Sequence, residues 1–339
     1  MQTATLSKNS FAEILYAKAD NYFKTKQSGK YATGIFYSKG ILLILVYISA
    51  YIYFVFFSSH LGEMLLMAFI LGICHVFIPV NISHDAIHES LSKRKWINTL
   101  GLYGFEITGS SSYMYGKKHL EAHYNKENGS KTIAIESQGL LLQKNNEERK
   151  INLPVIFYLF YSQYMIFIRD YVLFFQSPKT IPVKELVKLF FFKLVYFFAF
   201  IILPFIYINA PWWQILISLL FMYFIVTAAL VIILLMPTEK MESTRINDNS
   251  INESWIMEIL AHNVDFSSGS IFLNRIAGGA NLNVVHYLFP SVNHVHYNKL
   301  AGIIEETANE YGLHYRKQIV KDVFGIHFNY LKNIQRSNN

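Results

Sequence analysis

Long apolar runs alternate with polar segments along this chain, and their lengths predict its architecture. Four runs qualify as candidate membrane spans: residues 41–58, 64–82, 191–208 and 212–236. The last run can cross a hydrocarbon core of about 30 Å by itself, whereas the second and third need flanking residues. Short polar links join the runs in pairs, with His60 in one link and Asn209 to Pro211 in the other. The pattern therefore predicts an all-α integral membrane protein with four transmembrane helices in two hairpins and a cytoplasmic helical cap.

A fifth apolar stretch, Leu153 to Phe175, is harder to interpret. It is interrupted by Gln163 and by the adjacent Arg169 and Asp170, and such residues are costly in the middle of a bilayer. A span here would place the later histidines of the chain across the membrane from the earlier ones. If the histidines form one site, this stretch must instead lie along the interface as a partly amphipathic helix.

Composition and charge agree with a membrane location and predict its orientation. Hydrophobic residues make up 53% of the 339 residues and charged residues only 16%, which is more apolar than a soluble domain. The first 40 residues hold six lysines, while the hairpin links hold no Lys or Arg. The positive-inside rule therefore places both termini in the cytoplasm, as in a multi-pass protein of a bacterial inner membrane. The net charge of +7 suits anionic lipids and an acidic partner, and nothing indicates nucleic-acid binding.

The chain shows no internal repeat and no composition shift that would mark a domain boundary. We expect a cytoplasmic N-terminal segment over residues 1–40 and one domain over residues 41–339, with cytoplasmic portions at 83–193 and 238–339. Cys74 is the only cysteine, which excludes a disulfide framework and a thiolate metal site. No cleavable signal peptide is visible in the first 40 residues.

Histidines recur at helical spacing just outside the predicted spans. His84 and His88 lie four residues apart in HDAIH, and His119 and His123 do so in KHLEAHYN, so each pair occupies one helix face. His286 follows in a third cluster, GGANLNVVHYLFPSVNHVHY. A single histidine is more often a hydrogen-bonded polar residue than a ligand, but three clusters on one predicted side favour a metal site. Neutral imidazoles that leave coordination positions open suit non-haem iron that activates dioxygen.

These histidine boxes, in this order, resemble those of the membrane fatty acid desaturases, in particular the acyl-lipid and linoleoyl-CoA desaturase-like branch. The resemblance runs from about Asn81 to the C-terminus and includes SKRKWINTLGLY after the first box and AGIIEETANEYGLHY near the end. It implies desaturation of a fatty acyl chain by O2, two electrons and a di-iron centre. It further implies that one iron is held by His84, His88, His123 and His286, while His119 belongs to the other.

The chain departs from the family pattern at positions that the resemblance assigns to the second iron. Members normally carry adjacent histidines in the second and third boxes, where this chain has Tyr124 and Tyr287. Asn283 replaces a Gln or His, and Met236 stands where a further histidine is expected. A phenol with a pKa near about 10 is a poor metal ligand at neutral pH. We therefore expect a weakened or absent second site, whose volume the two tyrosine rings fill.

Five other polar residues are expected to support the site or the fold. Asp85 is the natural acceptor for the N–H of a ligand imidazole, and His262 is expected beside the ligands. His294 and His296 are expected to form hydrogen bonds rather than bind metal. His75 lies within a span and either faces the site or contacts a neighbouring helix.

Two classes of function stay open. An enzyme would desaturate a fatty acyl lipid, acyl-CoA or acyl-carrier substrate, or would hydroxylate it at a single-metal site. A non-catalytic relative would keep the fold and bind lipid or a partner protein. No HPGG-like haem motif occurs in the sequence, so electrons are expected from an external donor, either ferredoxin or a cytochrome b5-type protein.

Overall fold

The computed structural model describes residues 10–26, 29–124, 160–176, 180–235, 251–319 and 322. These residues are mostly helical, and the strands among them are β1 (Asp265–Phe266) and β2 (Lys317–Gln318), which pair in parallel. The chain divides into two compact units. The membrane unit comprises residues 34–120 and 151–233, and the terminal unit comprises residues 1–33, 121–150 and 234–339.

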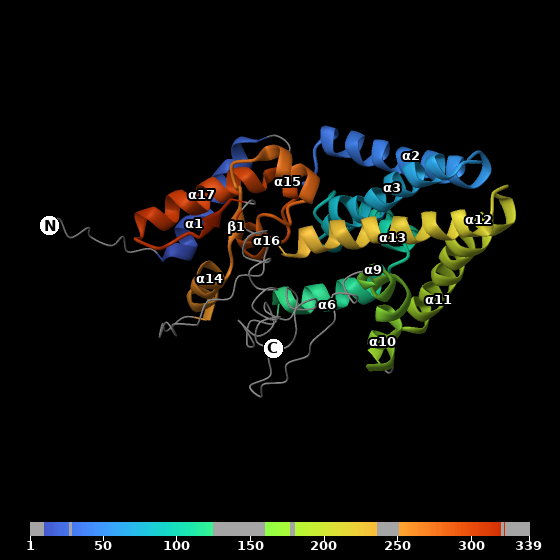
Figure 1. Ribbon diagram of the computed structural model, residues 1–339. Coiled ribbons are helices and arrows are strands. Elements are labelled where there is room, and N and C mark those ends of the chain that lie inside the picture. Colours follow the sequence, from blue (N-terminus) through green and yellow to red (C-terminus); the bar gives the residue numbers. More distant parts are fainter. Residues whose placement is uncertain are drawn as a thin grey trace, which may run out of the picture. The chain divides into compact units, whose positions relative to one another are not determined.

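The membrane unit contains the four predicted spans. The first span is α2 (Gly34–Phe56), and the second is the segment Leu61–Ile87, formed by α3 (Leu61–Ile78), the π-helix η1 (Pro79–Ser83) and α4 (His84–Ile87). The third is the segment Val183–Tyr207, formed by α11 (Val183–Phe197), the π-helix η5 (Phe198–Ile202) and α12 (Leu203–Tyr207). The fourth lies in α13 (Trp212–Leu235). Figure 1 shows α2 and α3 side by side as the first hairpin. Four spans in two hairpins are thus confirmed. The first and third helices begin earlier than the apolar pattern indicates, because Lys39 and Lys184 continue them.

His75 connects two of these spans by hydrogen bonds. Its Nδ1 donates to the carbonyl of Leu71, 2.8 Å away, so its Nε2 accepts from the hydroxyl of Tyr196 in α11, 3.0 Å away. Both ring nitrogens of this buried histidine therefore have partners within the membrane unit. Of the two roles considered for His75, contact with a neighbouring helix is the one observed.

The described part of the fifth apolar stretch, residues 160–176, packs against the spans. It contains α9 (Tyr161–Gln163), the π-helix η3 (Tyr164–Ile168) and α10 (Arg169–Gln176). The candidate spans found among the described residues do not include these helices. The amide of Ser162 donates to the hydroxyl of Thr227 in α13, 3.2 Å away. Asp170 is fully buried and lies between Arg169 and Lys193 of α11. The two charged residues that argued against a span are therefore paired.

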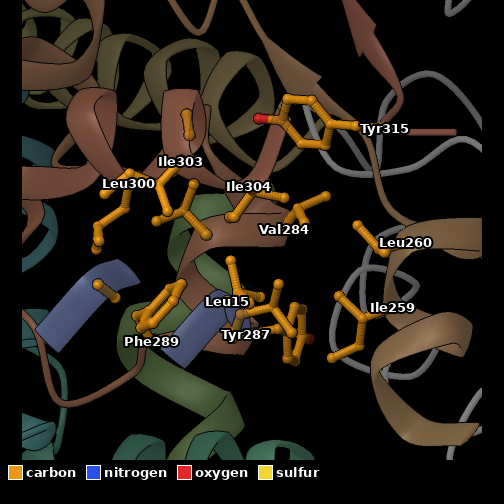
Figure 2. Packing of buried hydrophobic residues seen from close by; sticks show 14 of the residues in the cluster. Leu15, Ile259, Leu260, Val284, Tyr287, Phe289, Leu300, Ile303, Ile304 and Tyr315 are labelled. Carbon is orange, nitrogen blue, oxygen red and sulfur yellow. The ribbon is translucent and has the colours of Figure 1, made fainter. Parts of the chain in front are cut away.

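The terminal unit combines the first helix of the chain with its last ones. Its helices are α1 (Phe11–Thr25), α14 (Ile251–His262), α15 (Ile271–Ala277), α16 (Asn283–Leu288), the 3₁₀ helix η6 (His294–His296) and α17 (Tyr297–Glu310). Figure 2 shows their shared core, in which Leu15 of α1 lies among Ile259, Val284, Leu300 and Ile304. The described residues before Gly34 thus belong to the same compact unit as the C-terminal region. The N-terminal segment expected over residues 1–40 stays a prediction.

Candidate metal site

The first histidine pair lies where a membrane helix changes its geometry. Pro79 begins η1, and proline cannot donate the backbone hydrogen bond that an α-helix needs. Such π-helical turns often accompany functional sites. His84 begins α4 and His88 follows its last residue. The amide and hydroxyl of Ser90 both donate to the carbonyl of Asp85 at 3.0 Å, which closes this helix end and holds both histidines there.

His119 completes a group of three imidazoles in the membrane unit. It lies on α6 (Ser112–Tyr124), and its Nε2 is 3.0 Å from Nε2 of His84 and 2.7 Å from Nε2 of His88. Two nitrogens in adjacent positions of an octahedral ion, each about 2.1 Å from the metal, lie about 3.0 Å apart. The distances from Nε2 of His119 to the other two donor atoms are therefore close to the spacing that one metal ion requires.

The protonation state of His119 also suits a ligand. Burial lowers the pKa of His119 to about 3, so its ring is neutral at physiological pH. Neutral imidazole is the form that binds metal. Both the type of this donor and its neutral charge therefore fit the iron that the resemblance implies.

Tyr115, which the sequence reasoning missed, holds the ring of His119. It lies one turn earlier on α6, and the two rings stack with centroids 5.3 Å apart and an interplanar angle of 17°. Phe105 of α5 (Lys95–Ile107) lies 4.8 Å from the Tyr115 ring, and the guanidinium of Arg169 lies 5.6 Å from its centroid. The i, i+4 spacing of YGKKH could have indicated this contact.

The terminal unit holds a histidine pair of its own. Nε2 of His123 lies 2.8 Å from Nε2 of His286, and both residues are buried. The ring centroid of Tyr287 is 4.7 Å from that of His123. The structure thus brings His119 to the first box within one unit, and His123 to the third box within the other. The grouping of four ligands around one iron that the resemblance implies stays a prediction.

Two other candidates have hydrogen-bond partners in the terminal unit. Nε2 of His296 donates to the carbonyl of Tyr31 at 3.0 Å, so its Nδ1 accepts from the hydroxyl of Tyr22 at 3.2 Å. His296 therefore forms hydrogen bonds, as expected. The side-chain amide of Asn283 donates to Oδ1 of Asn263, 2.6 Å away.

The remaining candidates are placed only in part. Asp85 and His294 are buried. Met236 lies outside the described residues, and so do the side chains of Tyr124 and His262. The roles expected for these five residues stay predictions.

Asp265 supports the helix that carries His286, and the sequence reasoning missed it as well. Its Oδ1 accepts from the amide of Val284 at 2.7 Å, and its Oδ2 accepts from the hydroxyl of Tyr315 at 2.6 Å. Burial raises the pKa of Asp265 to about 7, although these hydrogen bonds oppose the rise. The carboxyl group therefore fixes the first turn of α16 to β1.

Comparison with protein families gives a match to the fatty acid desaturases over residues 63–319. The chain belongs to the fatty acid desaturase family. It is 25% identical over 336 residues to an sn-1 linoleoyl-lipid 6-desaturase of Arthrospira platensis, a match that covers 92% of this chain and 90% of that protein. An acyl-lipid (8-3)-desaturase of Physcomitrium patens is 23% identical over 93% of this chain and 69% of its own length. No solved structure matches the chain.

Membership of the fatty acid desaturase family confirms the resemblance drawn from the histidine boxes. Together with the four apolar helices it identifies a membrane protein. The family implies an oxidoreductase that acts on fatty acyl lipids, and it suggests non-haem iron as the metal for the histidines described above.

Proposed function

We propose that this desaturase-family protein is an iron- and O2-dependent membrane enzyme that introduces a double bond into a fatty acyl chain. The observation that carries the proposal is the group of three imidazoles of His84, His88 and His119 in the membrane unit. Bound iron would supply O2 activation, because nitrogen donors leave coordination positions open. In the balanced reaction, a –CH2–CH2– unit, O2, two electrons and two protons give –CH=CH– and two water molecules.

The residues of the chain have distinct roles in this proposal. Five histidines serve as iron ligands: His84, His88, His119, His123 and His286. The stacked Tyr115 ring keeps the His119 imidazole in one orientation. The apolar helices of the membrane unit admit the acyl chain from the bilayer, so that its reactive carbons need not cross water.

Lipid analysis tests the proposed reaction directly. The protein is expressed in a host with simple fatty acids, and mass spectrometry measures new double bonds. We expect His84→Ala and His123→Ala to abolish oxidation of acyl chains, whereas His296→Ala retains at least part of it because His296 is hydrogen-bonded to Tyr31 and Tyr22. Full activity in His84→Ala would refute its role as a ligand.

A hydroxylase with a single-metal site is the second candidate function. It is favoured by the altered positions Tyr124, Tyr287, Asn283 and Met236, and by the contact of the Tyr287 ring with His123. The iron content of purified protein separates the alternatives. Two irons per chain support a di-iron centre and one supports the single-metal site. No iron after iron-replete expression would favour a non-catalytic relative that binds lipid or a protein.

The proposal includes an external electron donor and a cytoplasmic site. An acidic ferredoxin or cytochrome b5-type protein would suit a chain of net charge +7, because opposite charges favour association. We propose that residues 83–193 and 238–339 share the cytoplasmic side with both termini. Labelling of engineered cysteines in intact cells, with Cys74 replaced, tests this topology. Cysteines near residues 130 and 310 that react from opposite sides would refute it.

A further inference from the structure

The hydroxyl of Tyr297 reaches His286 on the side of the ring that faces away from His123. Nδ1 of His286 lies 3.0 Å from Oη of Tyr297, while its Nε2 lies 2.8 Å from Nε2 of His123. All three residues belong to the terminal unit. One nitrogen of the His286 imidazole thus contacts His123, a proposed iron ligand, and the other contacts the phenol of Tyr297.

We propose that Tyr297 is a positioning residue that fixes the tautomer and the orientation of His286 for iron binding, and that Gly279 provides the space that its ring needs. The inference rests on the proposed function. When Nε2 of an imidazole binds a metal, Nδ1 carries the proton and donates it to an acceptor that orients the ring. Here the phenol oxygen of Tyr297 is that acceptor.

The surroundings of Tyr297 hold its hydroxyl in one place. The residue is 2% exposed and begins α17, directly after η6. The side chain of Asn293 accepts from the amide of Val295 and so caps η6. A ring fixed at its backbone and buried along its length can orient another side chain, because it has few alternative rotamers.

Gly279 shows why the double glycine before the third histidine box is needed here. Its φ is +84°, and a Cβ at this position would lie 2.8 Å from Cε2 of Tyr297 and 2.8 Å from Cβ of His294. The amide of Gly279 donates to the carbonyl of Asn274, whose side chain in turn donates to the carbonyl of His294. The turn therefore cannot move aside easily, and a side chain here would displace the Tyr297 ring.

Anaerobic Fe²⁺ binding to the full-length protein in detergent, measured by competition with a chelator, tests the inference. Tyr297→Phe keeps the ring and removes only the hydroxyl. We expect Fe²⁺ affinity to fall about 10- to 100-fold, the typical effect of losing a partner of a ligand, with the unfolding midpoint of the metal-free protein unchanged. Tyr22→Phe is the matched control, since it removes a tyrosine–histidine hydrogen bond from His296 in the same unit. Its Fe²⁺ affinity should equal that of the unaltered protein.

A double-mutant cycle tests the part assigned to Gly279. Gly279→Ala should weaken Fe²⁺ binding in the unaltered background but not in the Tyr297→Phe background. If Gly279→Ala does not fold, Tyr297→Phe alone decides. Unchanged affinity in Tyr297→Phe, or a loss matched by lower stability of the metal-free protein, overturns this inference alone. Failure of the unaltered protein to bind Fe²⁺ overturns the proposed function together with it.

Discussion

Replacing Asp170 by Asn should destabilise the membrane unit strongly, because its carboxylate is the anion of a buried ion network. Asp170 is fully buried, and its oxygens lie 2.8 Å from Nζ of Lys193 and 3.0 Å from a guanidinium nitrogen of Arg169. At an effective dielectric constant of about 20, each contact corresponds to about 6 kcal/mol of Coulomb attraction, most of it offset by desolvation. Removing one partner of a buried pair costs about 3–5 kcal/mol.

Two carbonyls should moderate this loss. Nζ of Lys193 also donates to the carbonyl of Gly109, 2.7 Å away, and to that of Ile166. Because these acceptors remain when Asp170 loses its charge, we expect the lower end of the range, about 3 kcal/mol.

The assay is reversible unfolding in detergent micelles, followed by far-UV circular dichroism. Glu310→Gln is the control, because it removes the same charge from an ion pair with Lys18 that has the same N–O distance of 2.8 Å. In that pair the side chain of Glu310 is 49% exposed and that of Lys18 is 29% exposed. Exposed pairs contribute about 0–1 kcal/mol, so the control should change little. Equal losses in the two variants would refute the argument from burial.

Two further predictions concern packing and pH. Gly72→Ala should lower the free energy of unfolding by about 1–3 kcal/mol in the same assay. The added Cβ would lie 2.8 Å from Cβ of Ile225 and 2.9 Å from the carbonyl oxygen of Met222, both in α13. Gly62→Ala is the control and should be neutral, because a Cβ there would have no atom within 4 Å. Asp265 has a folded pKa of about 7 against an unfolded value of 3.8, so the folded state binds more protons between these values and stability falls as pH rises through this window. Between pH 5 and pH 8 the free energy of unfolding of the unaltered protein should fall by on the order of 2–3 kcal/mol more than that of Asp265→Asn. Equal falls in the two proteins would contradict the raised pKa of Asp265.

The sequence predicts the spans because bilayer thickness sets the length of an apolar helix. The same reasoning placed His60 and Asn209 to Pro211 in short links, where the structure has them between helices. It does not predict the start of the first span, because Lys39 continues the helix. Nor does it predict that α1 packs on α17, since an amphipathic pattern identifies a buried face but not its partner.

In the candidate site, too, the sequence predicts which side chains share a helix face but not which residues they contact. The four-residue spacing in the first two boxes predicts that two imidazoles share a helix face, but it cannot say which other box they meet. The structure brings His119 to His84 and His88, whereas the resemblance assigns it to the other iron. Tyr297 lies eleven residues after His286 in the sequence, and no helical spacing connects the two. Contacts of this kind depend on the turn at Gly279, which only the folded chain reveals.

The hydrogen-bond partners of the imidazoles distinguish structural histidines from proposed metal ligands in this protein. His75 has a carbonyl at one nitrogen and a hydroxyl at the other, so its hydrogen-bonding capacity is satisfied by the protein alone. In the group of His84, His88 and His119, the Nε2 atom of each ring faces another Nε2 atom. Three imidazole nitrogens in this arrangement are the kind of donor set that binds a metal cation. The same rule identifies His296 as structural, because a carbonyl and a hydroxyl occupy its two nitrogens.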